Sequence, residues 1–176
     1  MAELSSAEKT AMEKELRRRQ SILSTTGLGV IAFGLWSFLK MNLYFLLGAD
    51  TMFNGVEIDP SISRRLVFVL SYILGLIIAC VILFVHARIG RSAISEAKGV
   101  QKRYRYVGVS TALIVFYIAS VVFTVITLDF KAPTFPDYIA SILVDSTSVI
   151  MFTELVLSAR KVRSLRQELQ KEAGER

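Results

Sequence analysis

Four long apolar runs, separated by polar connections, dominate the chain. A helix that crosses a bilayer needs about 20 mostly apolar residues. The pattern satisfies this requirement at residues 28–47, 66–85, 107–128 and 138–157. Four uninterrupted runs of this length disfavour the alternative, a buried soluble bundle. We therefore expect an all-α, polytopic membrane protein, with four transmembrane helices in an up-down bundle.

Composition agrees with a membrane location. Of the 176 residues, 53% are hydrophobic, and the mean hydropathy is +0.50, whereas soluble domains average about 45–50% apolar residues. Residues 1–21 are highly charged and contain no apolar core of a signal peptide. We expect them to form a charged cytoplasmic helix, followed by a membrane domain over 22–158. Val162, Leu165 and Leu169 fall at helical spacing, so residues 159–176 are expected to form a basic helical tail in the cytoplasm.

Basic residues alternate between the connections in the way that four spans require. Lys and Arg gather before the first run, between the second and third, and after the fourth. Because cytoplasmic loops retain these residues, both termini are expected in the cytoplasm. The small size favours a bacterial inner membrane. The side chains expected to contact anionic headgroups are Arg17, Arg18, Arg19, Arg88, Arg91, Lys102, Arg103, Arg105, Arg160 and Lys161. This arrangement accounts for the basic charge without a nucleic-acid partner.

Two local patterns concern packing. Ser71, Gly75 and Ala79 are small residues at every fourth position, which permits close helix contact. Gly90 and Gly99 bracket a polar stretch in the connection between the second and third runs. This stretch predicts a short separate helix with a glycine break at each end.

Two opposite charges occur at matched depth in the predicted membrane. Lys40 in the first span and Asp145 in the fourth both lie about 4 Å outward of the span midpoint, at about 1.5 Å per residue. Tyr72 and Ser120 lie near the same level of the other two spans. An ionised group in mid-membrane normally faces protein or water and finds a partner. The sequence therefore predicts a buried polar layer of Lys40, Tyr72, Ser120 and Asp145.

Glu154 is a second acid in the fourth span, and helical geometry places it on the side opposite Asp145. We expect it to be buried, with Lys161, His86 and Arg88 as candidate partners. Since one helix cannot turn both acids into a single bundle, we expect a homo-oligomer or another membrane protein as partner.

Further polar residues recur along one face of the third and fourth spans, and they would line a pathway if the protein transports ions. They are Tyr117, Thr124, Ser141 and Ser148.

These features favour a non-enzymatic accessory, scaffold or regulatory component of a membrane assembly, in which a Lys–Asp pair fixes helix packing. The alternative is an oligomeric ion channel, or a proton- or cation-coupled transporter, that uses Asp145 and the polar faces of spans three and four. Cys80 is the only cysteine and His86 the only histidine. Because Cys/His metal sites and nucleophile–base pairs need more such groups, we expect no enzyme activity, metal site or cofactor.

Overall fold

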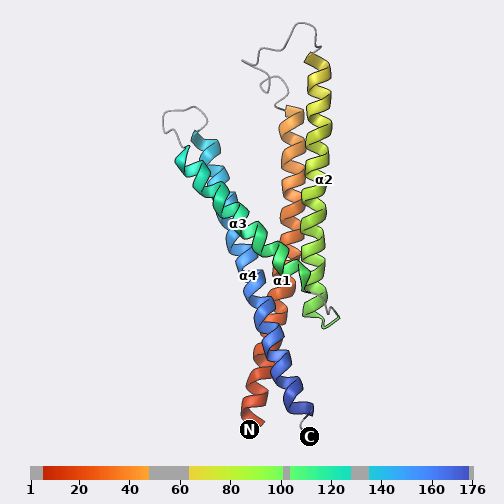
Figure 1. Cartoon of the computed structure of the whole chain (residues 1–176), viewed down its shortest axis with the longest axis vertical. Coiled ribbons are helices and arrows are strands. Elements are labelled where there is room, and N and C mark those ends of the chain that lie inside the picture. The colour runs from red at the N-terminus through yellow and green to blue at the C-terminus, as the bar shows by residue number, and fades with distance from the viewer. Residues whose placement is uncertain (1–5, 48–63, 101–103, 128–134, 175–176) are drawn as a thin grey trace. The chain divides into compact units, whose positions relative to one another are not determined.

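The structure, a computed structural model, describes residues 6–47, 64–100, 104–127 and 135–174. These residues form four helices: α1 (Ser6–Leu47), α2 (Arg64–Ala97), α3 (Arg105–Ile126) and α4 (Phe135–Gly174) (Figure 1). Each helix is long and apolar enough to cross a membrane. The prediction of an all-helical protein with four such helices is confirmed. The up-down order of the spans and the cytoplasmic location of the termini stay predictions.

Two of the helices extend far beyond their apolar runs. Helix α1 has 42 residues, so the charged N-terminal segment and the first span form one helix. Helix α4 has 40 residues and continues through the polar tail to Gly174. At about 1.5 Å rise per residue, each helix is roughly twice as long as a bilayer's hydrocarbon core is thick.

The prediction of a short separate helix between Gly90 and Gly99 is wrong. Helix α2 runs through Gly90 without a break and ends at Ala97. A glycine inside a helix costs only about 1 kcal/mol, which packing readily offsets. The second glycine does end the helix. Gly99 has a φ of 82°, its N–H donates to the Glu96 carbonyl (2.9 Å), and the Val100 N–H donates to the Ser95 carbonyl (3.0 Å). This is a Schellman motif.

The chain divides into two compact units. The first unit, Ile31–Arg88, pairs the second part of α1 with most of α2. Gly34 faces His86, and Gly75 faces the ring of Phe45, so the two helices run antiparallel. A side chain on either glycine would overlap the opposite residue. Gly75 thus provides the close contact that the small-residue pattern predicts.

The second unit comprises residues 1–30 and 89–176. Within it, α3 packs along α4, and the start of α1 lies beside the end of α4 (Figure 1). Lys9 Nζ is 3.1 Å from Glu172 Oε2, and Gly29 faces Met151. We call its buried apolar residues the junction core, because they come from all four helices. The junction core consists of Leu23, Val30, Ile89, Ala93, Ala97, Tyr106, Phe152, Leu155, Val156, Ala159, Val162 and Leu165.

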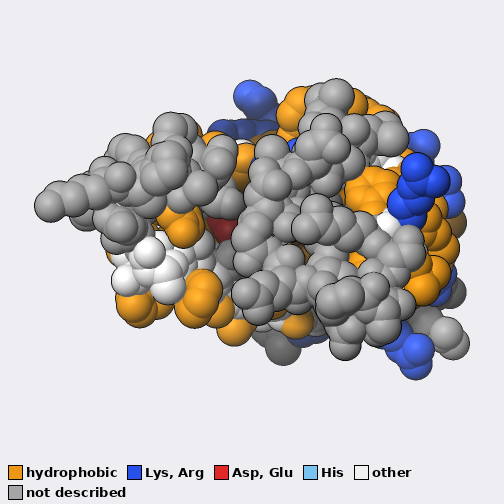
Figure 2. Space-filling model, turned by 90° about the horizontal axis from the view of Figure 1, so that it is seen from above, with side chains coloured by type: hydrophobic (Ala, Val, Ile, Leu, Met, Phe, Trp, Pro, Cys, Tyr) orange, Lys and Arg blue, Asp and Glu red, His pale blue; other side chains and the backbone are white. Residues whose placement is uncertain are grey.

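The apolar parts of the helices remain largely uncovered in a single chain. In the apolar 18-residue segment of each helix, the buried share is only 6% in α3, 11% in α2, and 22% in both α1 and α4. Hydrophobic side chains accordingly make up much of the described surface visible in Figure 2. Surfaces this apolar are stable only against lipid or another protein. The uncovered apolar helices are thus compatible with an integral membrane protein.

Candidate functional site: polar contacts between the helices

Asp145 receives a hydrogen bond across the interface between α3 and α4. The Ser120 hydroxyl donates to Asp145 Oδ2 over 2.7 Å, and both side chains are half-buried. An acid inside a membrane is costly unless it is hydrogen-bonded. Two members of the predicted polar layer, Ser120 and Asp145, are therefore in direct contact. Their positions differ by 25 in the sequence, so the contact holds two spans together.

The other two members of that layer belong to the unit Ile31–Arg88. The Tyr72 hydroxyl donates to Asn42 Oδ1 over 3.4 Å, which links α2 to α1. Lys40 is exposed within its unit. Since Lys40 and Asp145 lie in different units, their pairing stays a prediction. Asn42 was missed by the sequence interpretation, although an amide in an apolar run is a recognisable signal of helix contact.

The predicted polar faces of α3 and α4 are used mainly for packing. The ring of Tyr117 stacks on Phe152, with centroids 6.0 Å apart. Ser148 is buried, and its hydroxyl donates to the Val144 carbonyl of its own helix over 2.8 Å. Thr124 and Ser141 are half-buried. The Ser148 hydroxyl thus has an acceptor for its hydrogen bond, and the Tyr117 ring packs against α4.

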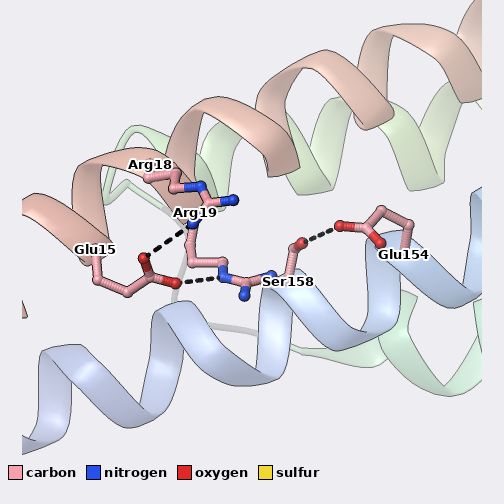
Figure 3. Close-up of polar contacts among 5 residues, drawn as sticks. All are labelled: Glu15, Arg18, Arg19, Glu154 and Ser158. Atoms are coloured by element: carbon pink, nitrogen blue, oxygen red, sulfur yellow. Dashed lines mark hydrogen bonds and ion pairs between the residues drawn. The ribbon is translucent and has the colours of Figure 1, made fainter.

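Glu154 is less buried than the sequence predicts. Its side chain is exposed in the single chain and accepts a hydrogen bond from the Ser158 hydroxyl over 3.3 Å (Figure 3). The reason is the orientation of α4, which turns Phe152, Val156 and Ala159 into the junction core. One of its predicted partners, Lys161, lies on the same helix and is also exposed. His86 and Arg88 belong to the other unit, so their pairing with Glu154 stays a prediction.

The basic residues predicted at headgroups are mostly exposed where the structure describes them. Arg19 is the exception: its Nε donates to Glu15 Oε1 over 2.8 Å, and its side chain extends from α1 toward α4 (Figure 3). Arg18 Nη1 lies 3.7 Å from Oε2 of the same Glu15 carboxylate. Lys102 and Arg103 lie outside the described residues. The exposed ones are Arg17, Arg18, Arg88, Arg91, Arg105, Arg160 and Lys161.

A buried polar cluster that the sequence interpretation missed joins α2, α3 and α4. Glu96 is fully buried, and the Tyr106 hydroxyl donates to its Oε2. Arg166 Nη2 donates to the backbone carbonyls of Glu96 (2.8 Å) and Ala97 (3.2 Å), at the end of α2. Arg163 lies 4.2 Å from the ring centroid of Tyr104, just before α3. We call Glu96, Tyr106 and Arg166 the junction cluster.

The junction cluster carries a fully buried acid. Burying a carboxylate is expensive unless its oxygens are hydrogen-bonded. Oε1 of Glu96 and the hydroxyl of buried Ser110 have no hydrogen-bond partner among the described residues. Tyr106 is thus the described donor to this carboxylate, and Arg166 supplies positive charge beside it. The signal in the sequence was weak, because Glu96 lies in a polar stretch that was predicted to form a short solvated helix.

Over the described residues, no group of three or more His, Cys, Asp or Glu side chains is placed to hold a metal ion. The chain matches no known protein family, no curated protein and no solved structure. The physical features of the chain itself therefore carry the functional interpretation.

Proposed function

We propose that this chain is a non-enzymatic integral membrane protein that serves as an accessory, scaffold or regulatory component of a membrane assembly. The observation that carries the proposal is the hydrogen bond from Ser120 to Asp145. A carboxylate that lines an ion path faces water, whereas this one is engaged by the neighbouring helix at half-burial. Its role is to fix the packing of α3 against α4.

Other polar groups support the same role. Tyr106 and Arg166 bring α3 and α4 to the end of α2 through Glu96. Tyr72 engages α1 through Asn42. Each group thus joins neighbouring helices. In the proposed assembly Lys40 completes the layer by pairing with Asp145, because an exposed ammonium group in an apolar span needs an anion.

The proposed setting follows from charge and exposure. The basic residues predicted at headgroups lie on the cytoplasmic side, against anionic lipids. The uncovered apolar faces contact lipid and a protein partner, which is a second copy or another membrane protein. A bacterial inner membrane fits the small size of the chain.

Ion flux in liposomes tests the proposal against its alternative, transport through Asp145. The purified protein is reconstituted into vesicles that contain a dye sensitive to pH, Na⁺ or K⁺, and the gradient of the matching ion is applied in each case. We expect the same leak as in protein-free vesicles, for the natural chain and for Asp145→Asn. Ser120→Ala is the matched control, since it removes the hydrogen-bond donor and keeps the carboxyl. A flux that Asp145→Asn abolishes, while the protein stays folded, would replace the scaffold proposal with transport.

A further inference from the structure

Contacts within the unit of residues 1–30 and 89–176 show which residues of α1, α2 and α4 lie at the same level along the helix axes. A Cβ at Gly27 of α1 would lie 2.9 Å from the Gly90 carbonyl oxygen and 3.1 Å from the Ala93 Cβ, so Gly27 is level with this turn of α2. A Cβ at Gly29 would lie 3.6 Å from the Met151 sulfur, so Gly29 is level with Met151 of α4. These contacts define one register for the three helices.

This register makes two of the predicted span limits incompatible. α1 and α4 are antiparallel, because the start of α1 lies beside the end of α4 (Figure 1). Leu28, the predicted start of the first span, is therefore level with about Phe152 of α4. Leu157, the predicted end of the fourth span, lies about five residues further inward, toward the predicted cytoplasmic side, which is about 7–8 Å. One flat bilayer surface cannot pass through both limits.

The exposed side chains of α1 and α4 decide between the two limits. Leu28 is 61% exposed, and every exposed described residue of α1 before it, beginning with Thr25, is polar or alanine. On α4, Ile150 is 70% exposed, and the next exposed residue is Glu154. By the register above, Glu154 lies within about one residue of the level of Thr25. Both helices thus change from apolar to polar exposure at the same level.

Helix α2 is polar at this level. Arg91 lies in the turn of α2 that faces Gly27, and its side chain is exposed. No other side chain from Ile89 to Ala97 is exposed. An exposed guanidinium group is costly in hydrocarbon and is stable beside water or phosphate. The surroundings of α2 are therefore polar at the level of Gly27.

Helix α3 also changes its exposure here. Its Tyr106 hydroxyl donates to Glu96, which lies about one turn inward of Ala93 on α2. Arg105, next to Tyr106, is exposed, and Val109, one turn outward, is 46% exposed. The step from Arg105 to Val109 thus brackets the level at which the other three helices change.

We infer that the headgroup layer on the cytoplasmic side of the bilayer surrounds the chain at the level of Gly27. This layer contacts what we call the headgroup belt, which consists of one exposed polar residue from each helix: Thr25, Arg91, Arg105 and Glu154. The two guanidinium groups bind lipid phosphates, and the carboxylate stays hydrated instead of entering hydrocarbon. The inference rests on the proposed function for the membrane location of the chain, and it adds where the membrane surface lies.

The headgroup belt moves the inner end of the fourth span from Leu157 to about Phe152. Leu157 is 54% exposed, but it lies only about 4–5 Å inward of Glu154. The polar layer on each side of a bilayer is about 5–7 Å thick. Leu157 thus stays within this layer, where a single exposed apolar side chain is normal. Glu154 accordingly needs no charged partner from another helix.

Labelling of single cysteines with a charged, membrane-impermeant maleimide tests the belt. Cys80, which is exposed, is first replaced by serine. On α4, Glu154→Cys is compared with Thr147→Cys and Lys161→Cys, since all three natural residues are exposed. Seven residues, or two helical turns, separate successive positions, so they share one side of α4 and differ by about 10 Å in depth.

A matched series on α1 leaves Glu154 in place. It consists of Arg18→Cys, Thr25→Cys and Ala32→Cys, which are likewise exposed and seven residues apart. Each variant is reconstituted in liposomes, and its helical circular dichroism signal is checked. The labelling rate of the reactive fraction is then measured, so the direction in which each molecule inserts does not affect the comparison.

We expect Glu154→Cys and Thr25→Cys to react within ~5-fold of the inward positions, Lys161→Cys and Arg18→Cys. The outward positions, Thr147→Cys and Ala32→Cys, should react at least ~20-fold more slowly, because the reactive thiolate does not form in hydrocarbon.

The outcomes separate this inference from the proposed function. Labelling at Glu154→Cys or at Thr25→Cys that is as slow as at the outward position of the same helix would overturn the headgroup belt and leave the membrane location intact. Fast labelling at both outward positions would overturn the belt together with the membrane location. The flux measurement judges the choice between scaffold and transport separately.

Discussion

Tyr106→Phe is the sharpest test of the junction cluster. The substitution removes one hydroxyl and keeps the aromatic ring, which is only 5% exposed. The lost hydroxyl is the donor to Glu96 Oε2, on a residue that is fully buried. Because the ring stays in place, no cavity forms, and the hydrogen bond is the main quantity that changes.

The size of the effect follows from the charge and burial of the acceptor. A hydrogen bond to a charged group contributes about 1.5–3 kcal/mol, and an acceptor left unsatisfied costs a similar amount. No second hydrogen bond compensates for the loss, because the other Glu96 oxygen, Oε1, has no partner among the described residues. We therefore expect Tyr106→Phe to reduce the free energy of unfolding by about 2 kcal/mol, which for a chain of this length lowers Tm by roughly 4–8 °C.

Thermal unfolding in detergent, followed by the helical circular dichroism signal, provides the measurement. Tyr104→Phe is the matched control, because it leaves the ring that contacts Arg163. Its effect should stay within about 0.5 kcal/mol. A double-mutant cycle with Glu96→Gln should show coupling of at least ~1 kcal/mol. Equal Tm values for the two Phe variants, together with strictly additive losses in the cycle, would refute the role assigned to Tyr106.

Three further predictions concern helix packing and charge pairing. A Cβ at Gly27 would lie 2.9 Å from the Gly90 carbonyl oxygen, so Gly27→Ala should cost about 1–3 kcal/mol in the same unfolding assay. At Gly108 a Cβ would meet no described atom within 4 Å, so Gly108→Ala should stabilise α3 by up to about 1 kcal/mol. If Gly108→Ala lost as much stability as Gly27→Ala, the loss at Gly27 could not be assigned to its close helix contact. Lys40→Met and Asp145→Leu should each destabilise the protein if the two residues pair, and the double variant should recover much of the loss. Additive losses would exclude that contact.

The sequence by itself determined the number of helices that are long and apolar enough to span a membrane, because such a run of apolar residues is a property of composition alone. It also singled out Asp145 as an acid that needs a partner, and it placed Ser120 at the same level. Which neighbour each polar side chain meets depends on how every helix is rotated about its axis, and tertiary packing sets that rotation. For this reason Glu154, which the sequence predicts to be buried, is exposed in the single chain, whereas Glu96, in a stretch predicted to form a short polar helix, is fully buried. Only the meeting of α2, α3 and α4 at the junction decided that Tyr106 and Arg166 would reach it.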